Sequence, residues 1–341
     1  MKNLALPLLL ILAPTTGLVY AKIQEPQEPQ TTPAKPAVPE GVDASLMQFF
    51  GALPKTMDRE GVPSTEAQIA LGRKLYFETR LSKDGTLSCN SCHGLDTYGV
   101  DNAQFSSGVD GQLGGRNAPS VYLAAGHVTQ FWDGRAADVE EQALGPILNP
   151  VEMAMDSAEQ VIDILKQDAA YPNLFAEAFP EDSEALTWEN VGRAIGAFER
   201  QLVTPSRFDD FLQGDAEALT KEEQMGFKTF LDTGCFGCHN GPYMGGQIYM
   251  KLGLVKEWPD QKDLGRFDVT GVESHKMVFK VPSLRNVAKT GPYFHDGSVD
   301  DLAEAVRLMS RHQRGIELTE EETASIVVFL EALTGELPKD L

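Results

Sequence analysis

Apolar residues recur every three or four positions in several separate stretches of the chain, which is the spacing of an amphipathic helix. Each stretch begins with a residue type that commonly caps a helix, and the pattern predicts helices that start after Thr65, Ser157, Thr187, Thr220 and Thr319. Ser157, Thr220 and Thr319 are each followed three residues later by a Gln or Glu, as in a capping box. Alternating runs of Val, Ile and Thr are scarce, so we expect a mainly α-helical fold with little sheet.

Long glycine-rich segments separate the predicted helices, notably residues 94–118 and 240–275. Loops of that length in a compact domain usually carry function or wrap a large group. A further helix is expected over residues 301–313, and the total length of 341 residues suggests about two domains.

The first residues have the pattern of an export signal rather than of a folded domain. Lys2 precedes the apolar run Leu4–Ala13, and small residues allow cleavage after Ala21, so residues 1–21 are predicted to be a signal peptide. The apolar run is shorter than the about 20 residues that span a bilayer, so we expect no membrane span in the mature protein; an uncleaved anchor helix is the alternative. Residues 22–41, rich in Pro and polar side chains, are expected to form an extended linker, and the protein is expected in the periplasm.

The chain carries 50 acidic and 29 basic residues, a formal net charge of −21. Such a surface repels phosphate backbones and anionic lipid, which argues against nucleic acid and membrane-surface binding and favours a basic protein partner. Four cysteines are too few for a disulfide-stapled mini-domain.

All four cysteines fall in two copies of the motif C-x-x-C-H, at residues 89–93 and 235–239. Two cysteines at this spacing can form thioethers to one haem, and the adjacent histidine can ligate the iron. A redox disulfide, a zinc site built from both pairs and a chance match are the alternatives. We expect two covalently bound c-type haems, attached at Cys89, Cys92, Cys235 and Cys238, with His93 and His239 as iron ligands.

An internal repeat supports two haem domains, predicted at residues 42–205 and 206–341. Similar sequences precede the two motifs at residues 71–74 and 225–228. After each motif, a Pro-Ser pair at 119 or 282 leads to a matching aspartate, Asp133 or Asp296. At the position before this aspartate one copy has Trp132 and the other His295, which suggests different roles for the two haems.

A methionine that closes the sixth position raises the potential of a haem and blocks ligand binding. In the second half Met309 lies on the predicted helix 301–313 and is the favoured ligand, with Met277 or His295 as rivals. Met244 and Met250 stand too close to His239 in sequence. In the first half Met153, Met155 and His127 lack a comparable helical setting, so the first haem is expected to have no sixth protein ligand.

An open ferric haem in an exported protein can bind peroxide, and cleavage of the O–O bond needs a group that moves a proton. Gln142 and Glu152 provide an amide and a carboxylate close together, between prolines that would fix the loop. The alternative is that both are ordinary surface residues.

Together these segments resemble the bacterial dihaem cytochrome c peroxidase family. The likeness extends from about residue 50 to 335. Besides the two haem motifs, it rests on Gly115–Pro119, Gln130–Ala136, Gly145–Met153, Val281–Val287 and Tyr293–Gly297.

The resemblance implies a site for each haem. It makes the first haem, on His93, the low-potential peroxide site, with Glu152 as acid–base carboxylate and Gln142 as its companion amide. Trp132 resembles the aromatic residue between the haems, and the second haem, on His239 and Met309, resembles the high-potential electron-entry haem. Asn117 matches a calcium-ligand position, together with the backbone carbonyls at Thr290 and Pro292. The resemblance also implies a homodimer and an electron donor that is a monohaem cytochrome c or a cupredoxin, with hydrogen peroxide as the substrate.

One departure from the family pattern concerns the loop after the first motif. Many members carry there a histidine that ligates the resting low-potential iron until the second haem is reduced, but the matching position is Val109. Valine cannot ligate iron, so we expect a first haem that is five-coordinate or water-bound at rest and needs no reductive activation.

Two other functions compete with the peroxidase. A dihaem enzyme that oxidises protein side chains would be expected to carry Tyr where Met309 stands, and a non-enzymatic electron carrier would leave Glu152 and Trp132 without a role. His275 and His312 are expected to face solvent.

Overall fold

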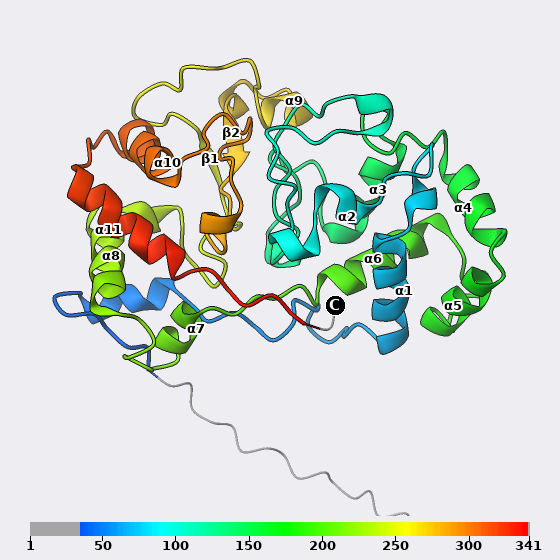
Figure 1. Ribbon diagram of the computed structural model, residues 1–341, viewed down its shortest axis with the longest axis horizontal. Coiled ribbons are helices and arrows are strands. Elements are labelled where there is room, and N and C mark those ends of the chain that lie inside the picture. Colours follow the sequence, from blue (N-terminus) through cyan, green and yellow to red (C-terminus); the bar gives the residue numbers. More distant parts are fainter. Residues whose placement is uncertain (1–34, 340–341) are drawn as a thin grey trace, which may run out of the picture. The chain divides into compact units, whose positions relative to one another are not determined.

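The computed structural model describes residues 35–339, which form a mainly helical fold (Figure 1). The predicted signal peptide and residues 22–34 of the predicted linker lie outside the described residues. The α-helices are α1 (Glu66–Tyr76), α2 (Cys89–Cys92), α3 (Val139–Leu148), α4 (Ala158–Lys166), α5 (Ala170–Ala178), α6 (Trp188–Glu199), α7 (Arg207–Leu212), α8 (Lys221–Asp232), α9 (Phe267–Thr270), α10 (Leu302–Met309) and α11 (Glu320–Glu331). Strands β1 (Tyr249–Lys251) and β2 (Val278–Lys280) form one antiparallel pair, which confirms the expectation of little sheet.

The predicted helix starts are confirmed, because local sequence fixes them. The side chains of Thr65, Thr187, Thr220 and Thr319 each accept a hydrogen bond from the backbone N–H three residues on, as N-caps do. Ser157 caps α4 in the same way, but the side chain of Gln160 accepts from the N–H of Asp156 instead of closing a capping box.

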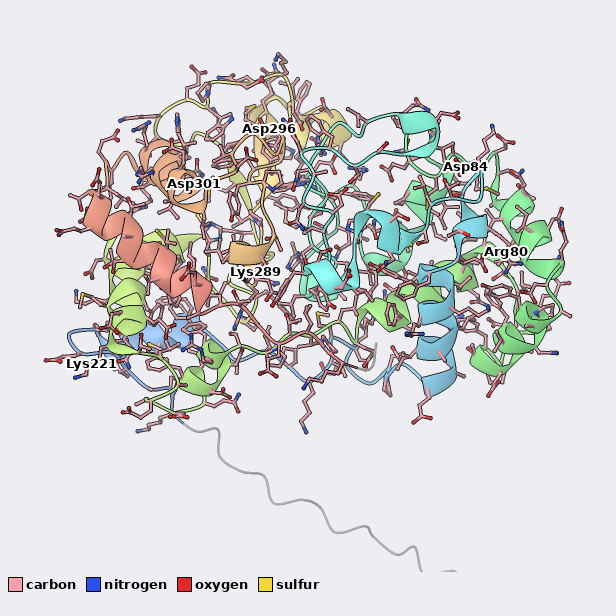
Figure 2. All side chains as sticks on the ribbon, viewed as in Figure 1. Arg80, Asp84, Lys221, Lys289, Asp296 and Asp301 are labelled. Carbon is pink, nitrogen blue, oxygen red and sulfur yellow. The ribbon has the colours of Figure 1, made fainter. Side chains whose placement is uncertain are left out.

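The helix expected over residues 301–313 has two parts. Asp301 caps α10 by accepting from the N–H of Glu304 (Figure 2). The α-helix ends at Met309 and continues as a π-helical turn, Ser310–Arg314. Such turns often occur at functional positions.

The internal repeat is visible as two helix pairs with the same packing, α1 on α6 and α8 on α11 (Figure 1). A glycine lets the backbones approach in each pair. A Cβ on Gly72 would lie 1.8 Å from the carbonyl O of Ala194, and one on Gly226 would lie 2.1 Å from the carbonyl O of Ser325. Since no side chain fits at either position, glycine is required for both crossings.

The loops after the motifs repeat as well. Positive φ angles occur at Phe131 and Phe294, at Gly134 and Gly297, and at Leu123 and Asn286, with a constant offset in residue number. Both halves therefore share strained turns as well as helices.

Two large hydrophobic clusters form the core. One is built mainly from α1 and α3–α6, and the other mainly from α7, α8 and α11. Met47 and Phe50, which precede α1, belong to the second cluster, and the N–H of Ala37 donates to the carbonyl O of Phe211. The segment 37–50 therefore packs on the second half, and the division into domains 42–205 and 206–341 stays a prediction.

A buried ion pair links distant parts of the chain. Arg285 donates to both carboxylate oxygens of Asp209, at 2.8 and 2.9 Å, and the two side chains are 1% and 4% exposed. Arg285 also donates to the Ser206 hydroxyl and to the carbonyl O of Pro242, so the buried charge is well compensated. Among residues 35–339, no helix is long and apolar enough to cross a membrane.

Candidate functional site

The two C-x-x-C-H motifs fold as single tight turns. Cys89–Cys92 forms α2, and Cys235–Gly237 forms a 3-10 turn. In both, the N–H of the histidine donates to the carbonyl O of the first cysteine, at 2.9 and 3.1 Å. One turn therefore brings two thiols and an imidazole together, as covalent haem attachment requires. In the described part of the chain the four cysteines are free, and no cluster of three or more His, Cys, Asp or Glu could hold a metal, which disfavours the zinc alternative.

Backbone carbonyls orient both imidazoles. Nδ1 of His93 lies 3.3 Å from the carbonyl O of Gly99, and Nδ1 of His239 lies 3.3 Å from that of Met244. Because a carbonyl only accepts, we assign the ring proton to Nδ1, which leaves the Nε2 lone pair available to a metal. Burial lowers the pKa of His93, and it lowers the pKa of His239 to about 4, so both rings stay neutral.

The second motif opens into a cavity with about 1240 Å³ of empty space, part of it open to solvent. Cys235, Cys238 and His239 line it together with Met309, and most of the remaining lining is apolar. This donor set fits a c-type haem, with imidazole and thioether available to the iron. Met250 and His295 also line the cavity, whereas the rival Met277 does not. The structure thus brings His239 and Met309 to one cavity, and the role of Met309 as an iron ligand stays a prediction.

The cysteines of the first motif are affected by burial and by nearby acidic residues. Burial raises the pKa of Cys89 to about 12. Burial also raises the pKa of Cys92, and the nearby carboxylates of Asp101 and Glu152 add to this rise. The charge of Glu152 therefore acts on the first motif.

Val109 lies directly on the segment that carries Glu152. Its N–H donates to the carbonyl O of Glu152 at 2.8 Å, and its side chain is 4% exposed. A Cβ on the preceding Gly108 would lie 2.0 Å from the carbonyl O of Val151, so glycine is needed for this approach. The structure therefore brings Val109 and the Glu152 segment together, and the charge of Glu152 acts on Cys92.

The Glu152 carboxyl is partly buried and has one donor. Oε1 accepts from Nδ2 of Asn149 at 2.8 Å. Burial raises the pKa of Glu152, while the charge of Arg135 and the Asn149 hydrogen bond act in the opposite direction. The Arg135 guanidinium stacks on Phe131, 3.4 Å from the ring centre.

Gln142 lies on α3, ahead of Glu152, and is half-buried. Among the hydrogen bonds of residues 35–339, none joins its side chain to Glu152. Its role as companion amide stays a prediction.

Trp132 connects the two halves. Its Nε1–H donates to the carbonyl O of Asn117 at 2.9 Å, its carbonyl accepts from the N–H of Lys280 at 2.8 Å, and its ring lines the second cavity. The ring centres of Trp132 and His295 are 6.4 Å apart. An aromatic side chain from the first half thus borders the pocket of the second.

The residues expected at a calcium site are only partly assembled. The N–H of Asn117 donates to the carbonyl O of His295 at 2.8 Å, but its side-chain Nδ2 donates to that of Ala103 at 2.9 Å. No described hydrogen bond joins the Asn117 side chain to Thr290 or Pro292. Carbonyl oxygens are numerous around this contact and suit calcium, which stays a prediction.

His312 is buried, so its expected exposure is wrong. Its Nδ1 lies 2.9 Å from the carbonyl O of Lys256, and its ring packs on Trp258 with centres 4.9 Å apart. The loop that contains Trp258 folds back over the π-helical turn, a contact between distant segments that local sequence does not signal. His275 is half-buried, with Nδ1 2.9 Å from the hydroxyl of Thr270.

The comparisons with known proteins agree on one family. The family model described as di-haem cytochrome c peroxidase matches residues 66–217. Cytochrome c551 peroxidase of Pseudomonas aeruginosa is 44% identical over 299 residues, covering 85% of this chain and 86% of that protein. Cytochrome c551 peroxidase of Nitrosomonas europaea is 45% identical over 280 residues, covering 81% and 82%.

A solved structure supports the same assignment. The crystal structure of a MauG-like protein associated with microbial copper homeostasis superimposes with a TM-score of 0.76 at 32% identity, covering 84% of this chain and 95% of that chain. We conclude that the chain is an oxidoreductase and belongs to the di-haem cytochrome c peroxidase family.

Proposed function

We propose that this protein is a periplasmic cytochrome c peroxidase that reduces hydrogen peroxide to water with electrons from a small redox protein, either a monohaem cytochrome c or a cupredoxin. The net reaction is H2O2 + 2 reduced donor + 2 H+ → 2 H2O + 2 oxidised donor. The observation that carries the proposal is an asymmetry. Met309 shares a cavity with His239, whereas Glu152, whose carbonyl O accepts from the N–H of Val109, acts through its charge on Cys92 of the first motif.

Two sets of residues would hold the haems. Cys89, Cys92 and His93 would hold the first, and Cys235, Cys238, His239 and Met309 the second. A haem with an open sixth position supplies peroxide binding and reduction, and one closed by a thioether supplies electron transfer. The remaining roles belong to the side chains around them.

Glu152 is the group that moves the proton. Its Oε1 is engaged by Asn149, which leaves Oε2 to exchange a proton. Burial raises the pKa of Glu152 toward the operating pH, which suits a carboxyl that must both take up and release a proton. We assign to Gln142 the orientation of the peroxide, on the family resemblance.

Trp132 provides the path for electrons between the two sites. The ring Nε1–H donates to the carbonyl O of Asn117, and the backbone carbonyl of Trp132 accepts from the N–H of Lys280. These bonds hold Trp132 at the wall of the second cavity, while its chain neighbours belong to the first half. Calcium at Asn117, Thr290 and Pro292 and a homodimer are further proposals that rest on the family resemblance.

Val109 makes the enzyme active without prior reduction. Valine has no donor atom, so this position would supply no ligand to a haem held by Cys89, Cys92 and His93, and such a haem would be able to bind peroxide in the oxidised protein. The test is Val109→His. We expect this variant, as isolated, to turn over peroxide only after partial reduction, whereas the wild type turns over at once with reduced cytochrome. A wild type that needs reduction as much as the variant does would contradict the proposal.

A further inference from the structure

A buried lysine stands between the two halves of the molecule and forms no ion pair with a carboxylate among the described residues. Lys280 ends β2, and its backbone N–H donates to the carbonyl O of Trp132. Lys280 is one of the residues that line the second cavity, and it is 8% exposed. Strand pairing and the Trp132 contact therefore fix the position of this lysine.

The Lys280 ammonium has only neutral contacts among residues 35–339. Nζ donates to the carbonyl O of Thr129 at 2.8 Å and lies 3.4 Å from Nδ1 of His127. Burial lowers the pKa of Lys280 to about 8, and the charge of Asp133 opposes this effect. A buried ammonium without a carboxylate partner is strongly unfavourable, so an anion at this place would remove a large penalty.

His127 supports the same conclusion. Its ring is buried and packs so closely on Gly246 that a Cβ there would lie 2.2 Å from Cδ2. Because an ammonium only donates, Nδ1 of His127 accepts from Lys280, and Nε2 then carries the proton. Nε2 has no hydrogen-bond partner in the described structure. The pair thus presents polar donors, and not acceptors, to its surroundings.

The cavity itself indicates which anion fits. Its lining is mainly apolar, and Cys235, Cys238 and His239 stand in it as attachment points for a haem. A haem c carries two carboxylate side chains that must be placed when the macrocycle is buried. Lys280 is a cationic residue of that lining, and its ammonium forms no hydrogen bond with a carboxylate of the described residues.

We propose that Lys280, held in place by Thr129 and His127, pairs with a carboxylate side chain of the haem attached at Cys235 and Cys238. This inference rests on the proposed haem attachment but not on the peroxidase activity. A positive charge beside a haem favours its reduced form, so the pairing raises the potential of the second haem and supports its role as electron entry. The backbone N–H of Lys280 also donates to the carbonyl O of Trp132, so the same residue would connect the haem pairing to the proposed path between the two halves.

The test compares three variants of the haem-loaded protein. Lys280→Met removes the charge, Lys280→Arg keeps it, and Lys251→Met removes a charge from an exposed lysine on the neighbouring strand β1. The readouts are the potential of each haem by spectroelectrochemistry and the haem-carboxylate vibrations in the resonance Raman spectrum. If Lys280→Met does not accumulate, Lys280→Gln gives the same readings.

We expect Lys280→Met to lower the potential of the second haem and shift its carboxylate vibrations, while Lys280→Arg and Lys251→Met stay near wild type. Equal potentials and vibrations in Lys280→Met and Lys251→Met would overturn the pairing, as would a shift confined to the first haem. The covalent haem content of wild type, measured as the pyridine haemochrome, separates the two proposals. Loss of haem attachment would refute the proposed function, whereas two haems with an unaltered potential would refute only the role of Lys280.

Discussion

Glu152→Gln is the substitution that tests the proposed chemistry most closely. Glutamine matches glutamate in size, and its amide oxygen can still accept from Asn149, as Oε1 does now at 2.8 Å. The change therefore removes the exchangeable proton and little else. General acid–base catalysis by a positioned side chain contributes about 10²–10⁴-fold, so we expect peroxide turnover to fall by about that factor, roughly 3–5 kcal/mol in the barrier.

The pH dependence of kcat/KM is an independent test of the role of Glu152. Burial raises the pKa of Glu152 above its ordinary value of 4.5. The first proton transfer needs the carboxylate, so kcat/KM should fall as the pH drops through this raised pKa. Asn149→Ala removes a donor that stabilises the charged form, which raises the pKa of Glu152 further and moves the acid limb to higher pH.

The assay is steady-state oxidation of a reduced monohaem cytochrome by peroxide, followed optically across pH. Glu159→Gln, an exposed acid on α4, is the matched control and should behave as wild type. Turnover of Glu152→Gln within twofold of wild type, or an acid limb that Asn149→Ala does not move, would refute the assignment of Glu152.

Three further predictions concern stability and the second haem. Gly226→Ala should cost about 1–3 kcal/mol of unfolding free energy in urea titrations, because the new Cβ would lie 2.1 Å from a backbone oxygen, whereas Gly115→Ala, with nothing within 4 Å, should cost little. Asp209→Asn should cost about 3–5 kcal/mol in the same titrations, because it leaves the Arg285 guanidinium buried without its countercharge; a loss below 1 kcal/mol would contradict this. Met309→Ala should lower the potential of the second haem in spectroelectrochemical titrations and open its iron to added ligands such as cyanide; an unchanged potential would show that another side chain closes that iron.

The sequence allowed the helices to be predicted where local signals decide them. Thr65 and Thr220 cap their helices through contacts with residues three positions away, so the information is contained in a few neighbouring residues. The haem motifs are equally local, and the helical pattern of residues 301–313 predicted that Met309 lies on a helix. In the structure α10 ends at Met309, which lines the same cavity as His239.

Features that depend on contacts between distant segments were not predictable in the same way. His312 is buried because residues 253–258 fold over it, and nothing near His312 in sequence indicates that cover. The environment of Lys280 is made by residues more than 150 positions earlier, including His127. The sequence therefore contains His312 and Lys280 but gives no sign of the distant residues that contact them in the fold.

The resting state of the oxidised protein tests the central claim most directly. Optical and EPR spectra of the fully ferric holoprotein, at room and low temperature, report the ligation of both irons. Addition of peroxide without reductant then shows whether peroxide reacts with the oxidised first haem. We predict one low-spin haem and one five-coordinate or water-bound high-spin haem, with immediate reaction of the latter. Two low-spin haems that ignore peroxide until one is reduced would contradict the account.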